Sequence, residues 1–451
     1  MISEKKRQRG LVLAMGGLGG LVMLDESIFG VALPSIRTEL DLSPTTAHWI
    51  INSYMLAFTC LAAIGGKAID LFGLRPALIV SASVFAVTSL VAGFAENAAM
   101  LISLRVVQGL CAAIIYPMSL AAATLTYGEK ERGKAVGISA TIATVFLAAG
   151  PLLGGVLTEF LSWRWVFWIN IPVLAVCVSL TLLLWRPPAR IAKRPKVDLM
   201  GLILLLAGLT TFIFGLMEGP DFGWSSPFIL GPLVIGALGL GGFFRFELKQ
   251  KTPLIDVQLF FSKSFHTDAL IVLLTQMTKI VVVIFVPHFL QLELSFSALW
   301  AGFGIIVAVL PYPFLAEPAG RIADRYGTRR PVLTGLTVLA LTNVLIGVAI
   351  HFESYWGLAP ALLVWGVAVP FTMLPATRSI ANSLPLEKQG EFGGLVMTAR
   401  LLGGTLGVTL GSVLLAMETG STWLFWVMAA IIATCCAYGA VVLEKETEAR
   451  A

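Results

Sequence analysis

The feature that most constrains this 451-residue chain is a long series of apolar stretches separated by short polar segments. A helix needs about 20 mostly apolar residues to cross the hydrocarbon core of a bilayer. Only 13% of the residues are charged, against about 25% in soluble domains, so a soluble fold could not cover its surface. The pattern predicts fourteen membrane spans, at residues 11–33, 46–66, 76–95, 98–125, 133–158, 163–185, 198–217, 226–245, 265–291, 298–318, 331–350, 357–380, 391–416 and 422–443.

Lysine and arginine residues concentrate on one side of these spans. Of the 31 basic residues, 26 fall at the two chain ends and in the loops that share their side, whereas the opposite loops hold only Arg37 and Arg164. Basic loops stay in the cytoplasm, so we expect a multi-pass protein of the cell membrane with both termini cytoplasmic. The absence of any Asn-x-Ser/Thr sequon is consistent with a bacterial inner membrane. The net charge of +5 therefore reflects topology rather than nucleic-acid binding.

An internal repeat divides the chain into two similar parts. The segment 66–75, after the second span, recurs as 320–329 after the tenth, 254 residues later. Four glycines of the fifth span recur in the thirteenth at an offset of 257, as positions 133 and 390, 137 and 394, 150 and 407, and 154 and 411. Duplicated six-helix bundles are typical of secondary transporters. We predict an N-terminal six-helix half at 1–195, an inserted helix pair at 196–250 and a C-terminal six-helix half at 251–451.

Two acidic and three basic residues lie well inside the predicted spans, away from the span ends, where a charge is costly and requires a partner or a function. Asp25 and Glu26 point about 100° apart around one helix, so at most one of them points squarely into a central cavity. We expect Asp25 to be the proton or cation site and Glu26 to be the second choice. The alternative is a buried ion pair with Arg105, Lys279 or Arg400. Both interpretations hold together if a carboxylate alternates between a proton and a basic partner.

The basic residues of the spans are interpreted as partners for these acids. Arg105 is expected to tune an acid in the cavity, with Gln108 as its hydrogen-bonding neighbour, and static packing is the alternative. Lys279 and Arg400 are weaker candidates for cavity charges. Lys279 could instead meet an anionic group on a substrate.

The repeated segments follow the pattern GxxxDxxGxR and resemble motif A of the major facilitator superfamily. Further stretches resemble the first-span motif, motif B, the motif C region and the inserted-pair flanks of its fourteen-helix drug:proton antiporter family, at 24–36, 105–109, 150–167, and 198–201 with 252–256. The resemblance covers essentially the whole chain. It implies an all-α membrane protein of the major facilitator fold, with two six-helix halves and two inserted helices, and it favours Asp25 as the proton site. Glu26 and Lys279 depart from the family pattern.

Motif A is predicted to act as a conformational latch between the two halves. Glycines permit a tight turn, while Asp70 can bond to backbone donors at a helix N-terminus or pair with Arg75. The alternative is that the basic residues only anchor the topology. The residues of both copies assigned to the latch are Gly66, Asp70, Gly73, Arg75, Gly320, Asp324, Gly327 and Arg329.

Motif C combines small residues with a proline in the fifth span. Small residues let two helices approach closely and a proline bends its helix. We expect this segment to seal the cavity on the outer side, against the alternative of ordinary helix packing. Its residues are Gly150, Pro151, Gly154 and Gly155.

The sequence carries no signature of an enzyme, a cofactor or a metal site. It has no P-loop, so ATP hydrolysis is not the expected energy source, and it has no GxSxG, HExxH or Cys/His constellation in a soluble segment. We expect a monomeric proton-coupled antiporter for multidrug efflux and antibiotic resistance. It would export lipophilic, cationic or zwitterionic small molecules by alternating access, with protons and membrane lipids as its other partners. The alternatives are an exporter of lipids or other amphiphiles, a symporter or uniporter, and a transport-inactive sensor on the same fold.

Overall fold

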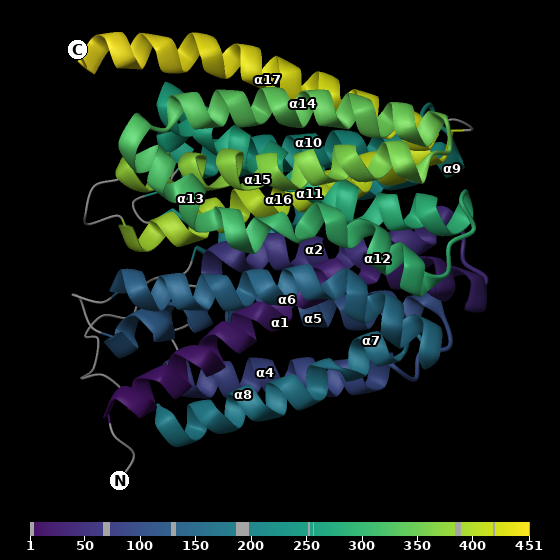
Figure 1. Cartoon of the computed structure of the whole chain (residues 1–451), viewed down its shortest axis with the longest axis horizontal. Helices are drawn as coiled ribbons and strands as arrows, with labels where there is room; N and C mark the ends of the chain where they lie inside the picture. Colours follow the sequence, from purple (N-terminus) through teal and green to yellow (C-terminus); the bar gives the residue numbers. More distant parts are fainter. Residues whose placement is uncertain are drawn as a thin grey trace. The chain divides into compact units, whose positions relative to one another are not determined.

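The computed structural model describes residues 4–65, 73–127, 132–185, 198–250, 253–255, 257–383, 389–417 and 420–450, which form helices and no strands (Figure 1). Thirteen helical segments in these ranges are long and apolar enough to cross a membrane. A further helix, α2 (Pro44–Gly65), has 22 residues and is therefore about 33 Å long, which suits a fourteenth span. The fold class predicted from the sequence is confirmed.

Contacts divide the chain into two compact units, which we call the N-terminal unit (Met1–Val197 with Ser297–Gly302) and the C-terminal unit (Asp198–Phe296 with Phe303–Ala451). The N-terminal unit is built around α1, whose most apolar window is 94% buried, because α1 packs on α2, α5, α6, α7 and α8. The helices of this unit are α1 (Glu4–Glu39), α2, α4 (Leu74–Ala92), α5 (Ala98–Tyr127), α6 (Arg132–Phe160), α7 (Trp165–Trp168) and α8 (Asn170–Leu184).

The C-terminal unit is built around α11, whose most apolar window is 89% buried and which packs on α15, α16 and α17. The two helices of the predicted inserted pair, α9 and α10, pack on each other, and α9 also packs on α16, so both belong to this unit. The remaining elements begin and end as follows: α9 (Leu199–Phe222), α10 (Pro227–Glu247), η2 (Val257–Phe261), α11 (Lys263–Leu292), α12 (Ala298–Val309), α13 (Pro311–Tyr326), α14 (Arg329–His351), α15 (Tyr355–Ser383), α16 (Gln389–Leu415) and α17 (Gly420–Arg450).

Two predicted spans are interrupted rather than continuous. The sixth span is divided between α7 and α8 at Ile169, and the tenth between α12 and α13 at Leu310. Prolines explain both interruptions, because Pro172 and Pro311 have no N–H to donate to the carbonyl of the preceding turn. Each pair of helices still forms one apolar segment of membrane-spanning length.

The two copies of motif A share an unusual backbone conformation. Gly73, which precedes α4, has φ 78° and ψ 149°, and Gly327, which precedes the helix at the equivalent place in the second copy, has φ 79° and ψ 171°. Residues that carry a side chain rarely adopt a φ in this range, so glycine is required at both turns. The repeat seen in the sequence therefore extends to local structure.

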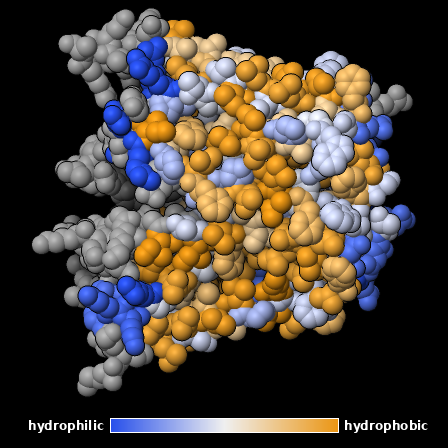
Figure 2. All heavy atoms as spheres, in the orientation of Figure 1, coloured by the Kyte–Doolittle hydropathy of each residue, from blue (hydrophilic) through white to orange (hydrophobic). Residues whose placement is uncertain are grey.

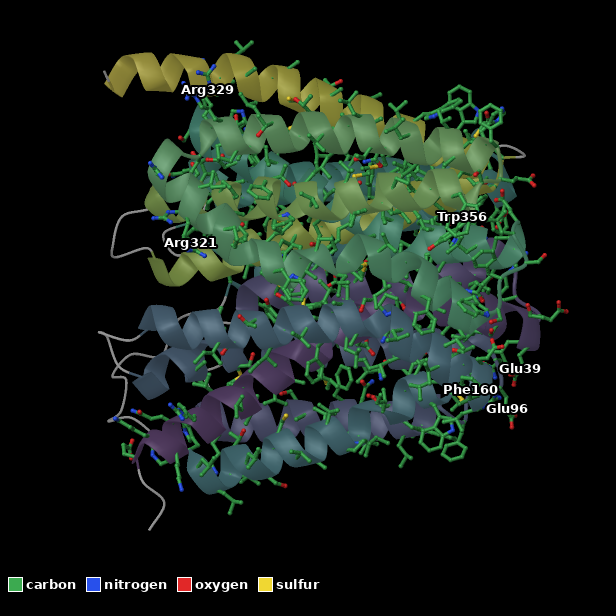
Figure 3. The ribbon with its side chains drawn as sticks, viewed as in Figure 1. Glu39, Glu96, Phe160, Arg321, Arg329 and Trp356 are labelled. Carbon is green, nitrogen blue, oxygen red and sulfur yellow. The ribbon has the colours of Figure 1, made fainter. Side chains whose placement is uncertain are left out.

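Polar residues gather at the helix ends of each unit, while apolar side chains cover the middle (Figure 2). Within the C-terminal unit, Arg321 and Arg329 lie at one end and Trp356 at the other (Figure 3). Within the N-terminal unit, Glu39, Glu96 and Phe160 lie together at one end (Figure 3). This distribution suits helices whose middle sections face the hydrocarbon core of a bilayer.

Candidate functional site

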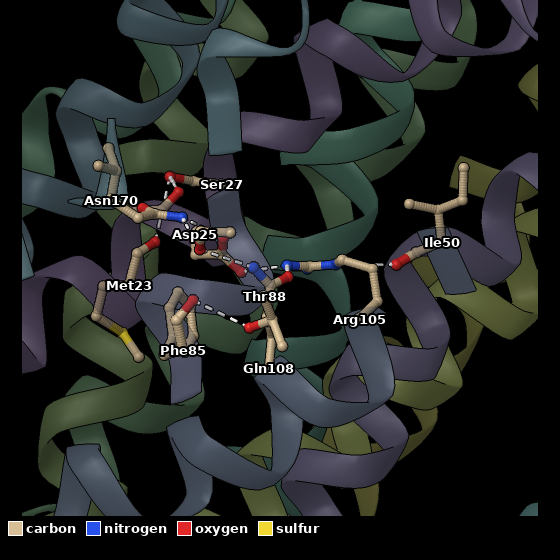
Figure 4. Close-up of polar contacts among 11 residues, drawn as sticks. Met23, Asp25, Ser27, Ile50, Phe85, Thr88, Arg105, Gln108 and Asn170 are labelled. Carbon is tan, nitrogen blue, oxygen red and sulfur yellow. Dashed lines mark hydrogen bonds and ion pairs between the residues drawn. The ribbon is translucent and has the colours of Figure 1, made fainter. Parts of the chain in front are cut away.

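The centre of the N-terminal unit holds a buried ion pair between α1 and α5. The Nη1 atom of Arg105 donates to Oδ2 of Asp25 over 2.6 Å, and the side chains of Arg105 and Asp25 are 1% and 0% exposed (Figure 4). Because the pair is shielded from water on all sides, breaking it would leave an uncompensated charge in a low-dielectric interior. The structure therefore joins the first-choice acid of the sequence to one of its three proposed basic partners.

Arg105 is held by more than its acid. Its Nε donates to the backbone carbonyl of Ile50 on α2 over 3.1 Å, and its Nη1 also donates to Oε1 of Gln108 over 3.0 Å. The rings of Phe29 and Tyr54 lie against the guanidinium, with Cζ 4.2 Å and 4.1 Å from their centroids. Cation–π contacts of this kind stabilise a desolvated guanidinium. Arg105 is thus fixed by α1, α2 and α5 together.

On its other side Asp25 is approached by Asn170 of α8, which also lies near Ser89 of α4. Asn170 Nδ2 lies 3.4 Å from Oδ1 of Asp25 and 3.4 Å from the Ser89 hydroxyl, and Gln108 Nε2 donates to the same hydroxyl over 2.9 Å. Asn170, Ser89 and Gln108 are at most 1% exposed. We call this buried network of Asp25, Arg105, Gln108, Ser89 and Asn170 the carboxylate cluster; Figure 4 shows Asp25, Arg105, Gln108 and Asn170.

The sequence predicted three members of the carboxylate cluster and missed the others. Ser89 and Asn170 are uncharged polar residues in apolar helices that also carry other serine or threonine residues, so nothing in the sequence set them apart. Tyr54 was also missed. Its ring covers Arg105, and its buried hydroxyl has no hydrogen-bond partner among the described residues.

Glu26, the second acid of the first span, is also buried, with 4% of its surface exposed. It follows Asp25 on α1, so the two side chains leave the helix in directions about 100° apart. The carboxylate cluster around Arg105 is therefore built on Asp25. Both acids lie close enough to Tyr54 to act on it electrostatically.

The C-terminal unit contains a second buried polar group, with different chemistry. Asn343 Nδ2 donates to the Thr278 hydroxyl over 3.2 Å, and Trp365 Nε1 donates to the same hydroxyl over 3.2 Å. At the repeat offset of 254 residues, Asn343 falls at the position of Ser89 and Lys279 at the position of Asp25. Lys279 lies on α11 and is 6% exposed. The repeat thus places a base in one unit where the other has an acid.

The remaining candidates from the sequence lie on several helices or outside the described residues. Arg400 lies on α16 and is partly exposed. In the first copy of motif A, Gly66 and Asp70 lie outside the described residues, whereas Arg75 is exposed and its Nη2 lies 3.4 Å from the carbonyl of Leu182. The side chain of Asp324 also lies outside the described part. Gly320 lies within α13, and Arg329 begins α14. The ion pairs expected of the latch stay predictions.

Two of the motif C glycines, Gly150 and Gly154, lie where α6 meets α1. A Cβ atom at Gly150 would lie 1.9 Å from the Ser27 hydroxyl, and one at Gly154 would lie 2.7 Å from the carbonyl of Ile28. The Ser27 hydroxyl itself donates to the carbonyl of Leu147 on α6 over 3.0 Å. Pro151 and Gly155 are buried on the same helix. These glycines allow the close approach of α6 to the helix that carries Asp25.

Comparisons with known proteins give this geometry a context. The family model described as Major Facilitator Superfamily matches residues 15–248 and 269–451. The cephamycin export protein CmcT of Amycolatopsis lactamdurans is 33% identical over 396 residues, covering 86% of this chain and 81% of that protein. A tetracenomycin C resistance and export protein of Streptomyces glaucescens is 30% identical over 417 residues, covering 92% of this chain and 76% of that protein.

The fold is also that of a solved transporter. The structure of the xylose transporter XylE from E. coli, in a partially occluded inward-open conformation, superposes with a TM-score of 0.65. The match covers 96% of this chain and 98% of that chain. At 12% identity, this similarity shows the fold alone. The chain belongs to the major facilitator superfamily and is a multi-pass membrane transporter rather than an enzyme.

Proposed function

We propose that this protein is a proton-coupled antiporter that exports lipophilic small molecules, with Asp25 as the site of proton exchange. The observation that carries the proposal is the buried Asp25–Arg105 pair, at 2.6 Å, inside a membrane-spanning unit. A charged pair is costly in such a place, and this cost favours a role beyond packing. If Asp25 gains a proton when its contact with Arg105 loosens, it would couple proton movement to transport.

The surroundings of the pair favour Asp25, not Arg105, as the group that changes state. Arg105 keeps its bonds to Ile50 and Gln108 and its contacts with two aromatic rings when Asp25 is neutral. Protonated Asp25 would lose the attraction between its negative charge and Arg105, and an oxygen of a neutral carboxyl group is a weaker acceptor. Arg105 would therefore stay in place as a fixed positive charge.

This asymmetry gives a mechanism for exchange. With Asp25 ionised the pair is neutral overall, and with Asp25 protonated it carries one positive charge. A cationic substrate is repelled by the protonated form and tolerated by the ionised form. Proton binding and substrate binding would then exclude each other, and alternating access would convert an inward proton gradient into outward transport.

The class of substrate follows from the relatives and from the charges. The two relatives described above are an export protein for cephamycin and a resistance and export protein for tetracenomycin C. We propose antibiotic-like amphiphiles, cationic or zwitterionic, as the substrates. Glu26 would add a second negative group for the cationic part and Lys279 a positive group for an acidic part.

The topology and the latch complete the proposal. The basic residues at one side of the spans favour cytoplasmic termini in a bacterial inner membrane, with the protein acting as a monomer. The two motif A copies, with their matching glycine turns, would stabilise one conformation against the other. Asp70 would provide the charge of that contact.

The experiment is uphill transport in everted vesicles, with the collapse of internal acidification as the readout. The panel contains lipophilic cations, zwitterions, cephamycin and tetracenomycin C. Asp25→Asn has the charge of the protonated form, so it should abolish acid-driven transport and weaken the binding of lipophilic cations while expression is retained, and Glu26→Gln should change preference among cations more than coupling. Glu96→Gln, an exposed acid at the end of the N-terminal unit, is the matched control. Full uphill transport by Asp25→Asn would refute Asp25 as the proton site.

A further inference from the structure

A second pair of carboxyl groups lies at one end of the α9–α10 hairpin. Asp198 is the N-cap of α9, where its Oδ1 accepts from the backbone N–H of Gly201 over 2.9 Å. Glu247 is the last residue of α10, where its Oε2 accepts from the backbone N–H of Leu254 over 2.8 Å and lies 3.4 Å from that of Ile255. One oxygen of each carboxyl group therefore has a backbone role.

The other two oxygens are buried and lie close to the same glycine. Asp198 Oδ2 and Glu247 Oε1 have no hydrogen-bond partner among the described residues, and Glu247 is only 2% exposed. A Cβ atom at Gly201 would lie 2.2 Å from Glu247 Oε1 and 2.9 Å from Asp198 Oδ2. The two oxygens thus converge over the same glycine and lie within about 5 Å of each other. Buried polar atoms of this kind require a partner.

A proton fits this site better than a metal ion. Calcium takes six to eight oxygen ligands and magnesium requires a near-ideal octahedron. Among the described residues there is no group of three or more His, Cys, Asp or Glu side chains that could hold a metal ion. A single proton between the two oxygens, in contrast, turns one acceptor into a donor and satisfies both.

We propose that Asp198 and Glu247 form a proton-binding carboxyl pair, in which Glu247 carries the proton and donates it to Oδ2 of Asp198. The assignment to Glu247 follows from position. Asp198 lies at a helix N-terminus, where the helix dipole and the Gly201 N–H stabilise a negative charge. Glu247 is the more deeply buried of the two and gains more from neutrality.

The described charged groups near Glu247, other than Asp198, do not act on its carboxyl group. On α10, Arg245 precedes Glu247 by two positions and leaves the helix on nearly the opposite face, whereas Lys249 lies in the turn beyond the end of α10. Residues 253–255 are Pro, Leu and Ile, and the described side chains of α16, which packs on α9, include only Arg400 as a charged group. Among the described residues, Asp198 is the one charged side chain that acts on Glu247.

The pair connects proton binding to the path of the chain. Protonated Glu247 holds the start of α9 through Asp198 and holds the segment leading to α11 through the amides of Leu254 and Ile255. Loss of the proton places two negative charges side by side. Their repulsion drives Glu247 away from Asp198 and weakens its bonds to the amides of Leu254 and Ile255. The α9–α10 hairpin is therefore attached to the entry of α11 in a proton-dependent manner. This site is separate from Asp25 and does not depend on what the protein transports.

The test is amide hydrogen exchange at Leu254 and Ile255 in the full-length protein in detergent, corrected for the intrinsic effect of pH. In the wild type, protection should fall by about tenfold per pH unit once the pair is deprotonated. Glu247→Gln keeps a donor toward Asp198 and an acceptor for the amides, so protection should stay high and independent of pH. Asp198→Asn, which can still cap α9 and can donate to an ionised Glu247, should behave in the same way if the first variant does not fold.

Two matched glycine variants test the geometry. Gly201→Ala places a methyl group between the two oxygens and should remove the protection, whereas Gly241→Ala on α10 has open space around it and should have no effect. In infrared spectra at neutral pH, the carbonyl band of a protonated carboxylic acid should weaken in Glu247→Gln and stay unchanged in the Glu96→Gln control. The proposal is overturned if Glu247→Gln retains the pH dependence of the wild type, or if added magnesium or calcium raises protection at constant pH.

Discussion

The contribution of the Asp25–Arg105 pair to stability can be measured with a double-mutant cycle. Arg105→Met removes the positive charge and leaves the Asp25 carboxylate fully buried, with the Asn170 amide at 3.4 Å as its remaining donor in the cluster. Stranding one member of a buried pair costs about 3–5 kcal/mol. The loss of two cation–π contacts adds about 1–2 kcal/mol. We expect the free energy of unfolding to fall by about 4–7 kcal/mol.

The reverse change should cost less. Asp25→Asn leaves Arg105 charged, but Arg105 retains the carbonyl of Ile50, the amide oxygen of Gln108 and both aromatic rings. We expect a loss of about 1.5–3 kcal/mol, the value of one hydrogen bond to a charged group. In the double variant no charge is stranded, and it should be more stable than Arg105→Met alone. The coupling energy should then be about 2–3 kcal/mol.

The assay is denaturant unfolding in one detergent at one pH for the wild type, both single variants and the double variant. Glu96→Gln combined with Arg105→Met is the control, because Glu96 is exposed and lies outside the carboxylate cluster, and this combination should be additive. Effects of Asp25→Asn and Arg105→Met that add within about 0.5 kcal/mol would refute the reasoning. Such additivity would mean that the two groups do not depend on each other in the folded protein.

Three further predictions concern sites outside this pair. Gly150→Ala should lower stability by about 1–3 kcal/mol, because its methyl group would lie 1.9 Å from the Ser27 hydroxyl, and an unchanged midpoint of thermal unfolding would show that α1 and α6 are not closely packed there. Glu39→Gln should cost less than about 1 kcal/mol although it breaks the pair with Arg164, since the Glu39 side chain is 48% exposed, and a larger loss in the same assay would contradict this. At the end of α11, burial and, to a smaller degree, the charge of Glu353 raise the pKa of Glu293. This raised pKa makes a contribution to stability that is complete below the unfolded value of about 4.3 and lost as pH rises through the folded value, so Glu293→Gln should flatten the pH dependence of the unfolding midpoint above pH 4, and an unaltered profile would count against it.

Much of the architecture was accessible from local sequence. The fourteen apolar windows predicted the helices well, and the offset of 254 residues predicted the matching turns at Gly73 and Gly327. The breaks at Ile169 and Leu310 were missed because the apolar character of both spans continues across them. Pro172 and Pro311 were visible in the sequence, but composition dominates a hydropathy window and conceals a single missing N–H.

The candidate site was only partly accessible. Asp25, Arg105 and Gln108 could be singled out because charged and strongly polar side chains are costly in a membrane. Tyr54 could not, since an aromatic residue in an apolar helix carries no sign that its ring covers a guanidinium. The paired oxygens of Asp198 and Glu247 were also hidden, because each residue stands at a helix end, where acids are ordinary.

The sequence by itself determined which segments cross the membrane, how they repeat and which charges must be explained. Each of these depends on the composition of one segment, because the cost of placing a helix in hydrocarbon is set by its own side chains. The choice of partners was decided by the tertiary structure alone. Asp25 meets Arg105 across 80 residues and Asn170 across 145, and before the helices were packed Lys279 and Arg400 remained open as weaker alternatives to Arg105. Which donor reaches a buried acid depends on the packing of α1 against α5 and α8, and no property of the individual helices contains that information.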